Sequence, residues 1–213
     1  GGAQSLRRAM VEIANREYAD VILSVVVGHD FSRDRMSYKW GRPRPAVIEI
    51  DGQLRWADVA HSHLHGTIFN PSVPNPALVF FYENVTLVAL AADAAAPQLV
   101  FPWAAFEQEH PDAASMPRVI EWTLQAFERI PVRRKILLLQ YAARLNDPAT
   151  LAERQLILKL SQDLAITVVD THALLSEQRP ELVWRGHHTP LGNKLVCRQL
   201  AESYGSEVTN ASR

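Results

Sequence analysis

The chain has 213 residues, of which 47% are hydrophobic and 21% charged. These fractions are close to those of average globular proteins and exclude a disordered or fibrous chain, while the length predicts one domain with a substantial core. Lys and Arg number 22 against 23 Asp and Glu, which argues against a nucleic-acid-binding protein because such proteins need a basic face. The one cysteine, Cys197, excludes an internal disulfide and a cysteine-based zinc site.

The first half of the chain begins with a helix and a strand. Residues 4–18 carry apolar residues at helical spacing and predict an amphipathic helix. Residues 21–27 form an apolar, largely β-branched run that ends at Gly28, which is typical of a strand buried on both faces. Residues 32–45 contain four arginines and two prolines and predict an irregular segment.

A hairpin and a less regular region follow. Residues 46–56 predict a β-hairpin, because Asp51-Gly52 supplies the positive φ angles of a type I′ turn. Residues 59–76 predict a loop, and 77–101 fit either two strands or one buried helix, since periodicity does not separate the two.

The second half alternates more clearly between helix and strand. We expect a helix from Pro117 to Ile130, a strand over 135–139, a helix over 148–164, a strand over 166–169 and a last helix over 190–204 with Gly205 as its C-cap. This order predicts an α/β sandwich with a parallel sheet. The region at about 32–115 breaks the order and is interpreted as an insertion into a single domain, 1–213.

Ligands of open parallel sheets bind at the carboxyl ends of the strands. This rule indicates three places: Gly28-His29-Asp30, residues 140–146, and Asp170-Thr171-His172. A fourth candidate is the loop before the last helix, which holds the adjacent histidines His187 and His188. A histidine there suits a general base; alternatively it caps the helix or faces solvent.

Two runs of the sequence resemble the SGNH/GDSL-type hydrolases. ADVILSVVVGHDF (19–31) is similar to the block in which a buried strand ends in Gly-x-Asn-Asp, and RGHHTPLGNKLVCRQLAE (185–202) is similar to the family's last block. Residues 41–54 and 133–147 resemble bacterial, often membrane-anchored members. The resemblance implies a three-layer α/β/α sandwich of the SGNH/flavodoxin-like type and a periplasmic or membrane-associated location.

The family's catalytic positions fall on altered residues. The resemblance places the base on His187 or His188, the oxyanion glycine on Gly2, and the oxyanion asparagine on His29. Arg185 stands where the family has an acidic residue, and a guanidinium there would lower the pKa of the histidine rather than stabilise its charged form. No residue of the chain matches the nucleophilic serine.

These departures predict a degenerate hydrolase, without a cofactor, that acts as an accessory or interaction subunit of a larger, membrane-associated assembly. Its partner would be another protein, bound through the 32–115 insertion. The alternative is a serine esterase, or a carbohydrate O-acetyltransferase or deacetylase, whose nucleophile lies on an upstream segment and whose substrate is a small ester.

A third interpretation concerns metal binding. His61, His63 and His65 occupy alternate positions. On a strand their side chains would point to one face, about 7 Å apart, which is compatible with zinc or copper. The alternative is that they are exposed histidines of a loop.

Overall fold

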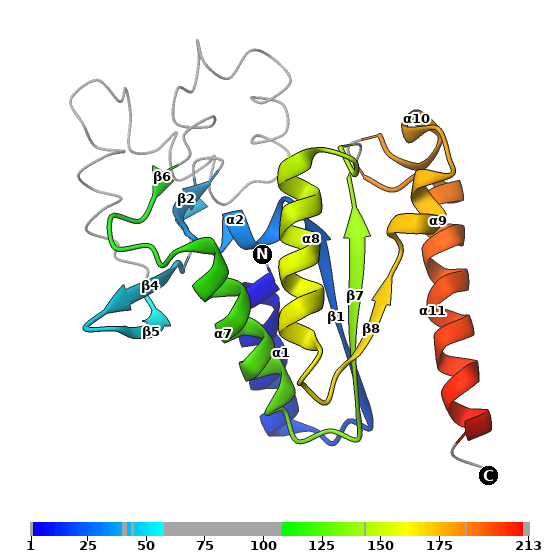
Figure 1. Ribbon diagram of the computed structural model, residues 1–213. Coiled ribbons are helices and arrows are strands. Elements are labelled where there is room, and N and C mark those ends of the chain that lie inside the picture. Colours follow the sequence, from blue (N-terminus) through cyan, green and yellow to red (C-terminus); the bar gives the residue numbers. More distant parts are fainter. Residues whose placement is uncertain are drawn as a thin grey trace, which may run out of the picture. The chain divides into compact units, whose positions relative to one another are not determined.

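The computed structural model (Figure 1) describes residues 2–39, 42–43, 45–57, 108–142, 144–185 and 187–210. The chain divides into two compact units, which are described separately. The first unit combines Gly1–Ser32 with Met116–Arg213, and the second is Arg33–Ser115. His61, His63 and His65, and the region 77–101, lie outside the described residues.

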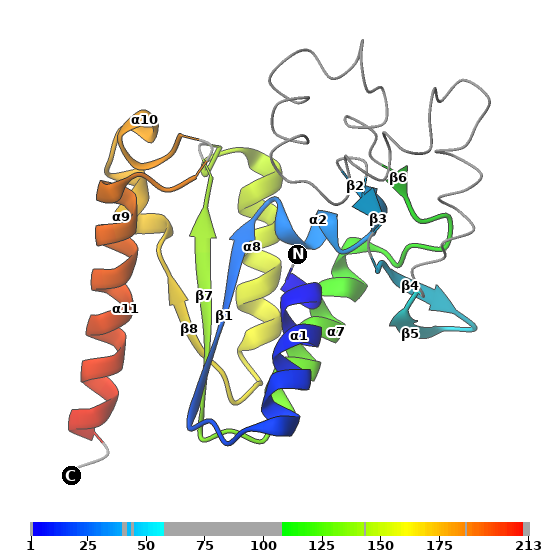
Figure 2. The same cartoon turned by 180° about the vertical axis from the view of Figure 1, so that it is seen from behind.

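The first unit is built on a three-stranded parallel sheet. Its strands are β1 (Asp20–Val27), β7 (Arg134–Tyr141) and β8 (Thr167–Asp170), in the order β1-β7-β8. β1 pairs with β7 from Asp20↔Arg134 to Val27↔Tyr141, and β7 pairs with β8 from Ile136↔Thr167 to Leu139↔Asp170. All three strands therefore end at the same edge of the sheet (Figure 2).

The buried positions follow from the strand order. The central strand β7 is covered on both faces, so four successive residues are at most 5% exposed: Ile136, Leu137, Leu138 and Leu139. In β1, by contrast, Leu23, Val25 and Val27 are buried, whereas Ile22 and Ser24, which alternate with them, are exposed. This alternation is typical of a strand with one buried face. The prediction that β1 is buried on both faces is therefore wrong.

Helices contact both faces of the sheet. α8 (Pro148–Ser161) passes in front of β1 in Figure 1, α7 (Met116–Glu128) and α1 (Gly2–Asn15) lie next to α8, and α11 (Pro190–Asn210) lies beside β8. Gly2 of α1 packs against Val25, while the Tyr204 hydroxyl of α11 donates to Asp20 at 2.9 Å. Asp20 and Val25 are an odd number of residues apart in the strand, so the two helices contact opposite faces. The chain is thus a mixed α/β protein whose layers are compatible with an α/β sandwich.

Buried side chains at helical spacing form the core beneath these helices. In α7 the buried residues are Val119, Ile120, Thr123, Leu124 and Phe127. Each large apolar side chain buried in this way contributes about 1.5–3 kcal/mol relative to its exposed state. Among the helices of the described residues, none has the length and apolar character required to span a membrane.

The second unit contains short antiparallel strands. β4 (Val47–Ile50) and β5 (Gln53–Trp56) form the predicted hairpin, with Asp51 at φ 52° and Gly52 at φ 75°. β2 (Met36–Lys39) pairs with β3 (Arg42–Pro43) and with β6 (Gln108–Glu109). The prediction of an irregular segment over 32–45 is therefore partly wrong, because part of it is ordered by pairing with a strand some 70 residues away.

Three short helices and one helix end differ from expectation. The short helices α2 (Asp30–Arg33), α9 (His172–Ser176) and α10 (Pro180–Val183) were not predicted. The last helix does not end at Gly205 but continues to Asn210. Glycine costs only about 1 kcal/mol inside a helix, so an established helix continues through it where no other signal ends it.

Candidate functional site

A pocket of about 350 Å³ lies at the carboxyl edge of the parallel sheet. Four segments line it: the end of β1 with its turn, the loop after β7, the start of α8, and the residue after α10. The lining residues are Val27, Gly28, His29, Ala142, Arg144, Asp147, Thr150 and Trp184. The rule that ligands bind where parallel strands end leads to this place, and His29 is the sequence-predicted site residue that lines it.

The turn after β1 requires a glycine. Gly28 has φ +78°, and a Cβ there would lie 2.7 Å from the Thr150 hydroxyl oxygen. The Gly28 N–H donates to the Glu153 carboxylate at 2.9 Å. Burial raises the pKa of Glu153, and the negative charge of Asp30 acts in the same direction, while the Gly28 N–H opposes both. The first turns of α8 are thereby joined to the end of β1.

His29 and Asp30 form a pair beside the pocket. The Nδ1 atom of His29 lies 3.4 Å from Oδ1 of Asp30, and the other carboxylate oxygen accepts the Val26 N–H at 2.9 Å. Burial alone would raise the pKa of Asp30, but the hydrogen bonds from His29 and Val26 outweigh it and the pKa is lowered. Asp30 is therefore a carboxylate at neutral pH, and its partner on the pocket side is the half-exposed His29 ring.

The His188 ring is packed in the loop without a hydrogen bond to the described residues. Its ring packs edge-on against Trp184 at 4.9 Å between centroids, and neither ring nitrogen has a hydrogen-bond partner among the described residues. Burial lowers the pKa of His188, although the Val183 carbonyl acts in the opposite direction. A Cβ on Gly192 would lie 2.8 Å from the His188 Nδ1 atom and 2.3 Å from the Val183 oxygen, so the helix start closes on the ring only because residue 192 is a glycine.

His187 and Arg185 lie on the outside of the same loop. Both are exposed, and the His187 ring is 6.4 Å from that of Trp184. The Arg185 Nε atom donates to the Glu181 carbonyl at 3.3 Å, and its backbone N–H donates to the His187 carbonyl. The Arg185 side chain is thus held by the end of α10. Of the described residues of this loop, Trp184 alone lines the pocket.

Gly2 lies in the first turn of α1, where the helix meets α2. A Cβ there would be 3.3 Å from the Phe31 ring and 3.4 Å from the Val25 side chain. The N-terminal end of α1 and the carboxyl end of β1 are near one another in both views (Figures 1 and 2). Close packing of helix on strand therefore accounts for a glycine at this position.

A polar cluster that sequence reasoning found only in part lies at the end of β8. The Oδ1 atom of Asp170 accepts from the Tyr141 hydroxyl at 2.8 Å and from the His172 N–H at 3.0 Å. Arg154 donates twice to Oδ2, each time at 2.7 Å. Burial raises the pKa of Tyr141, and the Asp170 charge raises it further. Asp170 therefore ties β7, α8 and β8 together rather than presenting a free carboxylate.

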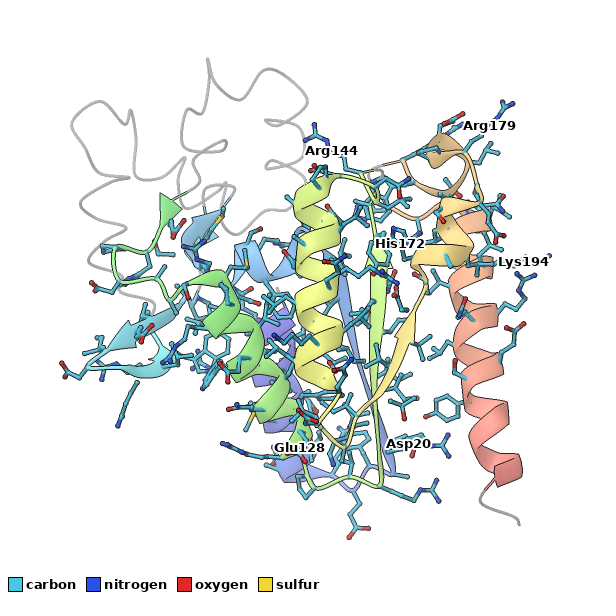
Figure 3. All side chains as sticks on the ribbon, viewed as in Figure 1. Asp20, Glu128, Arg144, His172, Arg179 and Lys194 are labelled. Carbon is cyan, nitrogen blue, oxygen red and sulfur yellow. The ribbon has the colours of Figure 1, made fainter. Side chains whose placement is uncertain are left out.

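Figure 3 places the labelled members of this region. His172 lies between β7 and α9, and its ring meets that of Tyr141 edge-on at 5.2 Å. Arg144 extends from the loop before α8, away from the sheet. Sequence reasoning indicated 140–146 but not Arg144 itself, nor Glu153 and Arg154 one to two turns into the helix. The signal for them is the helix start at Pro148, which directs the first turns of α8 to the carboxyl edge.

Within the described part of the chain, the site lacks a nucleophile joined to a base. The rings of His29, His187 and His188 form no hydrogen bond there to a serine, threonine or cysteine side chain. Cys197 is exposed on α11. No group of three or more His, Cys, Asp or Glu side chains that could hold a metal ion occurs among the described residues.

Comparisons of the chain with protein-family models, with curated proteins and with solved structures find no match.

Proposed function

We propose that this chain is an SGNH-like three-layer α/β/α domain that has lost hydrolase chemistry and acts as an accessory subunit of a larger assembly. The observation that supports the proposal is the environment of His188. A general base needs one ring nitrogen toward the nucleophile and the other toward an orienting acceptor, and both nitrogens of this ring lack hydrogen bonds among the described residues. Burial also disfavours the imidazolium that catalysis would form.

The second histidine of the loop offers no better base. His187 is exposed, and the residue two positions before it is Arg185 rather than a carboxylate. The position from which, by the resemblance, a carboxylate would orient the ring therefore holds a guanidinium instead.

The oxyanion position is altered as well. His29 stands where the resemblance puts the asparagine, and its Nδ1 atom is 3.4 Å from the Asp30 carboxylate. The hydrogen bonds that lower the pKa of Asp30 keep that carboxylate charged. A developing oxyanion beside it would be repelled rather than stabilised, which opposes acyl transfer in this pocket.

The remaining hydroxyl of the pocket is poorly placed for attack. Thr150 is 7% exposed, and its oxygen is directed at Gly28. This hydroxyl serves the packing of α8 against the turn after β1. Binding therefore accounts for this site better than catalysis does, and we assign the docking surface to the 32–115 insertion and the partner to another protein of a membrane-associated complex.

The test is esterase chemistry on this chain. We expect no turnover of p-nitrophenyl acetate above the rate of the His187→Gln and His188→Gln variants, and no covalent labelling by a fluorophosphonate. Labelling, or turnover that disappears in either variant, would overturn the proposal and favour the esterase or acetyltransferase. The Cys197→Ser variant is the control for the exposed thiol. The same turnover and labelling in this variant would show that Cys197 contributes to neither measurement.

A further inference from the structure

A second pocket, of about 210 Å³, lies between α1 and α7 at the other edge of the sheet. α1 ends at Asn15, shortly before β1 begins at Asp20, and β7 begins at Arg134, shortly after the end of α7. These two helix ends therefore lie where the strands start, as Figure 1 shows. All the residues that line the pocket belong to the first unit, and none of them lines the pocket at the carboxyl edge.

The space between the two helices follows from the packing of α1. Its buried residues are Gly2, Ala3 and Leu6, all in the first half of the helix, whereas residues 10–15 contain no buried side chain. Alanines line the pocket on both helices, at Ala14 and Ala126. Each has a single methyl group, so the helices leave a volume between them that a larger side chain at either position would fill.

The walls of the pocket are suited to an alkyl chain. Six of the seven lining residues are apolar: Met10, Ile13, Ala14, Ala126, Ile130 and Pro131. Ile130 is 4% exposed and Met10 is 51% exposed, so the pocket extends from the core to the surface. The unbranched thioether of a methionine adapts its shape to an apolar partner.

The seventh lining residue is Arg129, which is the charged residue of this pocket. Its backbone N–H donates to the Gln125 carbonyl at 3.2 Å, which holds the residue at the end of α7. None of the ion pairs found among the described residues involves Arg129, and no acidic residue lines the pocket. A guanidinium binds a carboxylate through two parallel hydrogen bonds. The pocket is therefore complementary to an apolar chain that ends in a carboxylate.

The volume of the pocket sets the length of that chain. An apolar cavity of about 150 Å³ accepts benzene, which has about the volume of a chain of six carbon atoms. On the same scale, the 210 Å³ of this pocket accept a chain of about eight carbon atoms.

We propose that this pocket binds the anion of a medium-chain fatty acid, with its alkyl chain between α1 and α7 and its carboxylate on Arg129. Burial of the methylene groups and the ion pair provide the affinity. The site goes beyond the proposed function, because neither the histidines of the loop before α11 nor the pocket at the carboxyl edge takes part. An esterase result of either sign therefore leaves it standing.

Isothermal titration calorimetry of the full chain with monomeric fatty acids tests the proposal. We expect saturable binding of one ligand per chain, with a Kd that falls about fourfold for each methylene from hexanoate to octanoate and changes little in chains longer than the pocket. Octanol, which lacks the charge, should bind about threefold to fivefold more weakly than octanoate, as expected for an ion pair at an exposed arginine. The absence of saturable binding, or equal binding of octanoate and octanol, would overturn the proposal.

Variants of the lining separate the roles of charge and space. Arg129→Gln should abolish the difference between octanoate and octanol. Arg133→Gln makes the same change of charge at a residue that is 73% exposed and outside the lining, and should keep the difference. Ala126→Leu fills the pocket and should weaken octanoate binding at least tenfold, with the Tm of the free protein unchanged. Ala14→Leu fills it from α1, which covers a failure of Ala126→Leu to fold. Unchanged octanoate binding in both filling variants would overturn the proposal.

Methionine methyl NMR locates the ligand. The chain has three methionines, of which Met10 lines the pocket, Met36 begins β2 and Met116 begins α7. Octanoate is expected to shift the Met10 signal, identified with Met10→Leu, and to leave the other two signals in place. Shifts of Met36 or Met116 without a shift of Met10 would overturn the proposal. So would binding of the protein to phosphatidylglycerol vesicles without saturable binding of octanoate, which would indicate a lipid surface instead.

Discussion

The backbone N–H of Gly28 donates to the Glu153 carboxylate at 2.9 Å, joining the end of β1 to α8 across 125 positions of the chain. This contact fixes one wall of the pocket at the carboxyl edge. It holds a carboxyl group whose pKa is raised by burial and by the charge of Asp30. Ionised Glu153 is thus a cost to the fold at neutral pH, although its oxygen is needed as an acceptor.

Glu153→Gln is expected to stabilise the protein at neutral pH, by up to about 1 kcal/mol, because glutamine keeps the acceptor oxygen and removes the charge. The folded-state pKa lies above the unfolded one, so wild-type stability falls as pH rises from the unfolded pKa through the folded pKa. The gain should therefore shrink toward acid pH. Urea titrations at pH 4 and pH 7 measure it, and an equal gain at both values would contradict the assignment to charge.

Gly28→Ala is expected to destabilise the protein by about 2–4 kcal/mol. The substitution places a Cβ at positive φ and 2.7 Å from the Thr150 oxygen, so backbone strain and overpacking add. Thr150→Ala removes the second term alone. In a double-mutant cycle by chemical denaturation, the pair should therefore cost less than the sum of its members, and strict additivity would show that the clash is relieved by movement elsewhere.

Gly28 and Glu153 show how much of the structure local sequence patterns predict. The strand ending at Gly28 and the helix starting at Pro148 were predicted because each has its own local signal. The contact between the two elements was not predicted, because the packing of α8 across the sheet decides which of its residues accepts the Gly28 N–H. The same holds for β2, whose partner β6 is distant in the chain.

The loop before α11 shows a second limit of prediction from sequence. The sequence indicated His187 and His188 as equivalent candidates, because both stand before the same helix. Only packing separates them: His188 lies against Trp184 and over Gly192, whereas His187 is exposed.

Arg154→Met is expected to cost about 2–3 kcal/mol. Asp170 is 17% exposed and would keep its neutral donors while losing both charge-assisted bonds from the guanidinium. Arg133→Met is a matched control, because that side chain is 73% exposed and lies 3.6 Å from Asp20. An exposed pair contributes little, so its loss should change the free energy of unfolding by less than about 0.5 kcal/mol. Equal effects of the two substitutions would refute the role given to Asp170.

His188 should make the fold sensitive to mild acid. Burial lowers its pKa in the folded state, so the unfolded chain binds the proton more tightly. The stabilising contribution of the neutral ring is complete above the unfolded pKa, and it is lost progressively as pH falls below it, with a slope of at most about 1.4 kcal/mol per pH unit. His188→Gln removes the titrating group, and His187→Gln, at an exposed position, is the control. Thermal unfolding from pH 8 to pH 5 should therefore show a shallower pH dependence for His188→Gln than for the wild type and for His187→Gln, and parallel curves for all three proteins would mean that the His188 ring is solvated in solution.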